Sequence, residues 1–129
     1  MSKSLNVKIG DTLIGVNQPI VERTQSFPKA SGTITIYVTK VGHVVNAYVD
    51  GTETTFNAWE TITVTDDLYK NVFTKTCAPL QLAKNASAIT YNGLGIEVYS
   101  DGRLVINNWG DISLSSASFT GCLTYVTAE

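Results

Sequence analysis

Apolar and polar side chains alternate one for one along residues 33–39, and this period of two constrains the fold more than any other feature. Ile34, Ile36 and Val38 point to one face of an extended chain, and the Thr and Tyr side chains between them point to the other. No segment of ten or more residues keeps a 3.6-residue apolar stripe, except a weak one at residues 66–73 that allows a single helical turn. The chain is therefore predicted to consist of strands.

The composition agrees with this prediction. The chain has 17 Thr, 13 Val and 10 Ile among 129 residues, and β-branched side chains favour strands. Its length fits a single domain. Turn signals recur about every 8–12 residues between short strands, which is typical of an antiparallel sandwich or small barrel. We expect an all-β fold, in which residues 1–29 form an N-terminal arm or linker with one short strand and residues 30–129 form the β domain.

Two hairpins are predicted. The first covers residues 33–49, turns at residues 40–42 and is followed by a tight turn at Asp50-Gly51. The second covers residues 95–107 and turns at residues 100–102. In this second hairpin one face is expected to be buried and the other to leave Glu97 and Arg103 in solvent; the buried side chains are Ile96, Val98, Leu104 and Ile106.

Three further regions are expected to form strands. They are residues 60–65, one or two strands in residues 72–82, and residues 119–127. Pro79 cannot donate to a sheet ladder, so it belongs at a strand start, an edge or a bulge. In a lone sandwich, the second faces of the first hairpin and of the strand at residues 119–127 would leave an exposed patch formed by Tyr37, Tyr48, Leu123 and Tyr125.

Several chemistries have little support. A net charge of −2 without a basic run argues against nucleic acid, and neither an apolar span of 20 residues nor a signal peptide is visible, which argues against membrane insertion. His43 is the single histidine, and it is more than thirty residues from Cys77 and Cys122 in the sequence, so no metal site is expected. The two cysteines are expected to be buried thiols. No cofactor and no catalytic triad are predicted, because His43 follows a turn where an exposed imidazole is ordinary.

The informative polar residues are of another kind. Aromatic and amide side chains gather at three predicted turns: residues 57–60, 91–93 and 107–111. Such clusters suit saccharides, whose C–H faces lie on aromatic rings while amides and carboxylates bind the hydroxyls. The first candidate site is the loop with Trp109, Asn108 and Asp111, where Trp109 is expected to be partly exposed.

A second candidate patch contains Trp59 and Asn57. The Trp59 ring lies next to a predicted strand, so a place in the core is the favoured alternative for it. Arg103 is a candidate for binding phosphate on a teichoic-type ligand, because the guanidinium group can bind two phosphate oxygens at once.

Residues 31–129 resemble the receptor-binding head domains at the C-termini of tail-tip and baseplate proteins from siphophages of Gram-positive bacteria. Three segments carry the resemblance: residues 31–45, with a Lys-Val-Gly turn; Cys77-Ala78-Pro79, a Pro-containing link; and residues 95–106, a late hairpin closed by Asp-Gly. The chain departs from the larger members of that family in lacking a long helical or interlaced N-terminal region.

The resemblance implies a jelly-roll-like antiparallel sandwich, a homotrimer, and binding of host cell-wall saccharide without catalysis. It also implies a place in the virion at the tail tip or baseplate, with other tail or baseplate proteins as partners and assembly in the host cytoplasm. Two alternatives stay open: a structural or accessory tail protein that joins neighbouring components without binding glycans, and a glycan-cleaving enzyme that uses a carboxylate pair.

Overall fold

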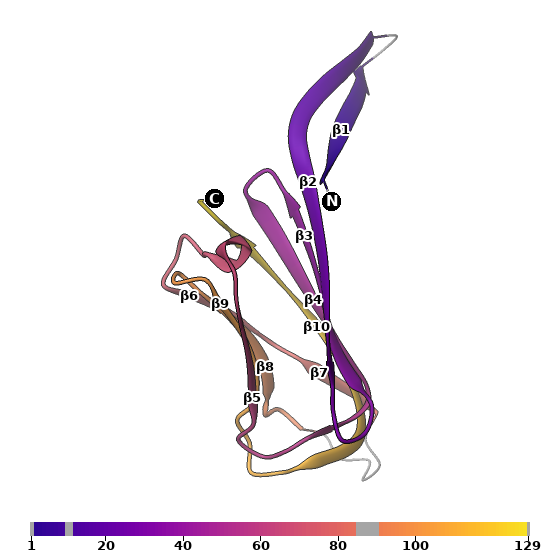
Figure 1. Ribbon diagram of the computed structural model, residues 1–129, viewed down its shortest axis with the longest axis vertical. Helices are drawn as coiled ribbons and strands as arrows, with labels where there is room; N and C mark the ends of the chain where they lie inside the picture. The colour runs from indigo at the N-terminus through magenta and orange to yellow at the C-terminus, as the bar shows by residue number, and fades with distance from the viewer. Residues whose placement is uncertain (1, 10–11, 85–90, 129) are drawn as a thin grey trace.

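The protein is an all-β sandwich of two antiparallel sheets, seen in a computed structural model that describes residues 2–9, 12–84 and 91–128 (Figure 1). Sheet A has the order β1-β2-β3-β4-β10-β7, and sheet B has the order β5-β9-β8-β6. The strands of sheet A are β1 (Ser2–Ile9), β2 (Thr12–Pro28), β3 (Thr33–Val41), β4 (Val44–Phe56), β10 (Leu114–Val126) and β7 (Gln81–Lys84). Those of sheet B are β5 (Thr61–Thr65), β9 (Arg103–Asn108), β8 (Leu94–Tyr99) and β6 (Lys75–Pro79). The predicted fold class is confirmed.

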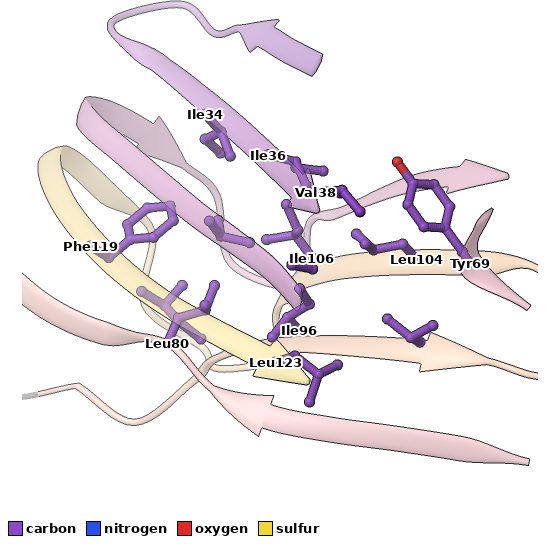
Figure 2. Packing of buried hydrophobic residues seen from close by; sticks show 14 of the residues in the cluster. Ile34, Ile36, Val38, Tyr69, Leu80, Ile96, Leu104, Ile106, Phe119 and Leu123 are labelled. Atoms are coloured by element: carbon purple, nitrogen blue, oxygen red, sulfur yellow. The ribbon is translucent and has the colours of Figure 1, made fainter. Parts of the chain in front are cut away.

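The core lies between the two sheets and follows the period of two. Ile34, Ile36 and Val38 on β3 are at most 2% exposed and face the side chains of β8 and β9 (Figure 2). The four apolar residues predicted to share a buried face in the second hairpin are all fully buried: Ile96, Val98, Leu104 and Ile106. The hairpin closes at Gly102, which has the positive φ of +93° that favours glycine there.

The single helical turn that the sequence allowed within residues 66–73 is present as the 3₁₀ helix η1 (Asp67–Tyr69), between β5 and β6. Asp66 caps it, since its carboxylate accepts a hydrogen bond from the Leu68 N–H at 2.9 Å. Leu68 and Tyr69 enter the core from this turn, and the Tyr125 hydroxyl donates to the Leu68 carbonyl at 3.1 Å. No helix among the described residues is long and apolar enough to cross a membrane.

The tight turn predicted at Asp50-Gly51 is wrong. Both residues lie inside β4, which continues to Phe56, and Gly51 pairs with Phe119 on β10. A Cβ on Gly51 would lie 2.5 Å from the Phe119 ring, and its φ is outside the left-handed region. This glycine therefore makes room for an aromatic ring in the core, a close approach that a local turn signal cannot distinguish from a turn.

The N-terminal residues form more strand than expected. Where one short strand was predicted within residues 1–29, β1 and the long β2 pair in antiparallel register. Residues 20–28 of β2 also pair with β3 along its whole length, so this part is a full strand of sheet A. β1 and the first part of β2 project beyond the rest of the sandwich (Figure 1).

Two predictions about outward-facing side chains need correction. Leu123 and Tyr125 are 5% and 3% exposed because they occupy the inward positions of β10, so only Tyr37 and Tyr48 of the predicted patch are exposed. The cysteines are free and exposed, not buried: Cys122 occupies an outward position on β10, and Cys77 does so on β6.

Candidate saccharide-binding groove

The three aromatic and amide clusters lie together at one end of sheet B. The Asn108 N–H donates to the Glu60 carbonyl and the Trp109 N–H to the Gly93 carbonyl, both at 2.9 Å. The loop after β4 also meets the loop after β9, since the Ala58 N–H donates to the Ser113 hydroxyl at 3.0 Å. The turns that the sequence singled out separately thus form one continuous surface.

The buried side chain of Asn108 connects these loops by hydrogen bonds. Its side-chain N–H groups donate to the carbonyls of Phe56, Asn57 and Ile112 at 3.0–3.1 Å. Its side-chain oxygen accepts from the Tyr91 hydroxyl and from the Gly110 N–H. The residue is 0% exposed, so its amide is used inside the protein. Asn108 therefore shapes the loops, and its side chain is not exposed on their surface.

The two tryptophans of this surface are both exposed. Trp109 is 49% exposed, as predicted, whereas Trp59 is 66% exposed, and its favoured place in the core is wrong. Trp59 has a positive φ of +63° at the tip of a turn, and the Glu60 N–H donates to the Asn57 carbonyl to close that turn. Trp59 therefore lies in the turn before β5 and not at an inward position of that strand.

Next to Trp109, the outer face of sheet B contains a groove of about 360 Å³, a size in the range of small-molecule sites. Its walls and floor come from β6, β8, β9 and the loops at their ends. The lining residues are Cys77, Ala78, Pro79, Asn92, Gly93, Leu94, Gly95, Ile96, Glu97, Asn107 and Trp109.

Gly95 opens the floor of this groove. In the sheet it stands between Asn107 on β9 and Pro79 on β6. A Cβ on Gly95 would lie 3.3 Å from the Asn107 side-chain oxygen and 3.5 Å from the Ala78 carbonyl oxygen. The missing side chain therefore leaves a gap that is bordered directly by the Asn107 amide.

Asn107 is the polar side chain best placed for a ligand. It is 3% exposed, yet among the side chains that the structure describes, residues 20–83 and 91–128, its amide makes no hydrogen bond. Among these side chains, every N or O atom that is fully buried has a hydrogen-bond partner. Because the Asn107 amide has none, its atoms are not fully buried, and they are exposed in the groove that the residue lines. Since buried polar groups are almost always hydrogen-bonded, this amide is available to a ligand.

Glu97 is the second buried polar group of the groove. It lies two residues after Gly95 on the same face and is 5% exposed, so the expectation that it points into solvent is wrong. The Tyr99 hydroxyl donates to its carboxylate, and this hydrogen bond raises the pKa of Tyr99. The Lys75 ammonium lies 3.5 Å from the other carboxylate oxygen. These neighbours, with Cys77 paired opposite on β6, cover the Glu97 side chain.

The other predicted site residues lie outside this groove. Asn57 and Asp111 are exposed in the adjoining loops and do not line it. Arg103 stands at the opposite end of β9, about 20 Å from Trp109 at roughly 3.3 Å per residue. There it pairs with Asp101 at 2.8 Å and stacks over the Tyr99 ring at 4.3 Å. The structure therefore separates Arg103 from the Trp109 loop.

A second, shallower depression of about 720 Å³ is lined by Ser31, Gly32, Thr33, Thr52, Glu53, Ser116 and Ser118. It has no aromatic side chain and no buried polar one among these residues. The groove beside Trp109 combines an exposed aromatic face with two buried polar groups, and is the better site. Among the groove-lining residues that the structure describes, Glu97 is the single acid.

Sequence reasoning named Asn107 within a cluster but did not choose it, and it placed Glu97 in solvent. The available signal was the cross-strand neighbourhood of Gly95, a glycine inside a predicted strand, which often marks a close approach of ligand or backbone.

In comparisons with known proteins, neither a protein-family model nor a curated protein sequence matches the chain.

Proposed function

We propose that this protein is a non-enzymatic saccharide-binding module and that its ligand lies in the groove beside Trp109. One observation carries the proposal: the half-exposed Trp109 ring stands beside two buried polar side chains, Asn107 and Glu97, over a floor opened by Gly95. The resemblance to phage receptor-binding heads extends it. The protein would then act in the virion, at the tail tip or baseplate, where it binds host cell-surface saccharide.

The chemistry of the groove suits a sugar residue. An aromatic face can pack on the C–H groups of a pyranose ring. The Asn107 amide offers both a donor and an acceptor, and the Glu97 carboxylate offers acceptors, which together match hydroxyl groups. A ligand without hydroxyls would leave the Asn107 amide unpaired, at a cost of about 1–3 kcal/mol. The groove therefore favours polyhydroxylated ligands over apolar ones of the same size.

A homotrimer, the assembly implied by the resemblance, is part of the proposal. Single glycan contacts are weak, and linked copies can gain about 10²–10⁴ in avidity. The outer face of sheet A supports an assembly because Tyr37 and Tyr48 pair across the strands, with ring centroids 6.1 Å apart, and are 44% and 39% exposed. Val44 and Val126 extend this apolar surface. Light scattering on a sizing column should give three times 13.9 kDa; a stable species of 13.9 kDa would exclude the trimer.

The same apolar face supports the alternative function, a structural or accessory tail protein that joins neighbouring components. In that case the face would contact another tail or baseplate protein, and the groove would stay empty. Particles that carry Trp109→Ala would then assemble and adsorb to the host as well as unmodified particles do. A loss of adsorption with normal assembly would favour saccharide binding.

The direct test is a screen of the purified protein against cell-wall polysaccharides, teichoic acids and simple sugars. We expect Trp109→Ala to lower affinity at least thirtyfold, as loss of a stacked aromatic hot spot commonly does. Trp59→Ala is the matched control, because that ring is exposed but does not line the groove. Circular dichroism checks both folds.

Two results would reject the function: no binding to any saccharide, or equal binding by both variants and the unmodified protein. Release of reducing ends from host wall material would instead show a glycan-cleaving enzyme. The single acid among the described groove residues speaks against that outcome, because most glycosidases use two carboxylates.

A further inference from the structure

We propose that the groove selects uncharged sugar residues and that Glu97 determines this selectivity by excluding anionic ones. The inference rests on the proposed saccharide function and names the class of saccharide. It concerns sugars that carry hydroxyls where uronic acids or sugar phosphates carry negative charge.

The first step is the position of the carboxylate. Glu97 lines the groove and is 5% exposed, whereas its cationic neighbour Lys75 has a side chain that is 44% exposed and does not line it. A ligand in the groove therefore meets Glu97, whereas Lys75 is not among the residues that line it. A buried carboxylate is screened less than one on the surface, so a second negative charge close to Glu97 is disfavoured.

The second step is the lack of a free cation to offset this charge. The Lys75 ammonium lies 3.5 Å from Glu97, and Arg103 pairs with Asp101 and stacks on Tyr99. Lys75 is thus engaged with Glu97 itself, and Arg103 is engaged at the opposite end of β9 from Asn107. No lysine or arginine is among the described residues that line the groove.

The third step is what Glu97 can accept. The Tyr99 hydroxyl occupies one oxygen, and the contact with Lys75 at 3.5 Å is long, so the carboxylate keeps acceptor capacity toward the groove. Asn107 and Glu97 are diagonal neighbours across β9 and β8, roughly 7 Å apart, and both line the groove. One sugar residue in that gap can donate a hydroxyl to Glu97 while Asn107 binds another.

The experiment uses immobilised glycans in matched pairs, each neutral hexose chain beside its uronic acid or phosphorylated counterpart. The unmodified protein should bind the neutral member at least tenfold more tightly. Glu97→Gln keeps the shape and removes the charge, so it should weaken neutral binding and bring the ratio close to one. Asp111→Asn is the matched control: it removes the same charge from an exposed loop residue outside the groove lining and should leave the ratio unchanged within twofold.

A second variant keeps the test valid if Glu97→Gln is unstable. Lys75→Ala leaves the carboxylate in place and removes its nearest cation, so the ratio should rise. The inference is overturned if the unmodified protein prefers the anionic member, if Glu97→Gln keeps the ratio, or if Asp111→Asn changes it equally; in each case the saccharide function still stands. Absence of binding to every glycan, neutral or anionic, would instead reject the proposed function and the inference with it.

Discussion

Replacing Asn108 by alanine should destabilise the fold, whereas the same change at the adjacent Asn107 should leave the fold intact and weaken binding. The two amides differ only in what they contact. Asn108 bonds three carbonyls and accepts two donors, while the Asn107 amide makes no hydrogen bond within the described residues and opens onto the groove. The pair therefore separates a stabilising amide from a binding one.

The magnitude follows from the partners that Asn108→Ala would leave unsatisfied. Phe56 is fully buried, so its carbonyl cannot recover a bond to water, and the Tyr91 hydroxyl also loses its acceptor. Each unpaired buried group costs about 1–3 kcal/mol, which gives roughly 3 kcal/mol in total. With an m-value of about 2 kcal/mol per M in urea, the midpoint should fall by roughly 1.5 M. Asn107→Ala should change stability by less than about 0.5 kcal/mol.

Urea unfolding followed by circular dichroism, with saccharide binding measured on the same samples, checks both expectations. Asn107→Ala should unfold at the same midpoint as the unmodified protein and bind at least tenfold more weakly. The reasoning is refuted if Asn107→Ala destabilises the protein as much as Asn108→Ala does, or if it retains full binding.

Three further predictions concern the groove and the core. Gly95→Ala should weaken binding, because its Cβ would lie 3.3 Å from the Asn107 side-chain oxygen and displace that amide; full binding would contradict this. Arg103→Ala should leave saccharide affinity unchanged within twofold, since it lies at the far end of β9; a tenfold loss would return it to the site. Burial raises the pKa of Tyr69 and Tyr125 above the usual 10, so stability should stay constant up to about pH 10 and fall above it, as the unfolded chain releases those protons first; denaturant midpoints that stay flat from pH 9 to 12 would contradict this.

The sequence could predict the elements whose signals are local. The alternation at Ile34, Ile36 and Val38 and the Asp-Gly turn of the second hairpin each depend on a few consecutive residues, and both are confirmed. The three aromatic and amide clusters could be found in the same way, because turn chemistry is local. That they meet at one end of sheet B follows from strand order, which no local pattern contains.

The errors have a common physical origin in contacts between distant segments. Gly51 resembles a turn residue until Phe119, 68 positions later in the chain, packs against it. Glu97 has an outward position, but Lys75, Cys77 and Tyr99 cover it once β6 pairs with β8. The burial of a polar side chain on an outward face depends on strand register, so the key groups of the groove could not be chosen from the sequence.

The two free cysteines allow the most direct test of the claim that saccharide lies in the groove beside Trp109. Cys77 lines that groove, whereas Cys122 lies on the outer face of sheet A, and both are exposed. The measurement is the rate at which a maleimide reagent labels each thiol, with and without a saturating amount of the neutral glycan that binds tightest in the panel. Labelling of Cys77 should slow at least tenfold while that of Cys122 stays the same. Equal rates at Cys77 with and without bound glycan would contradict the account.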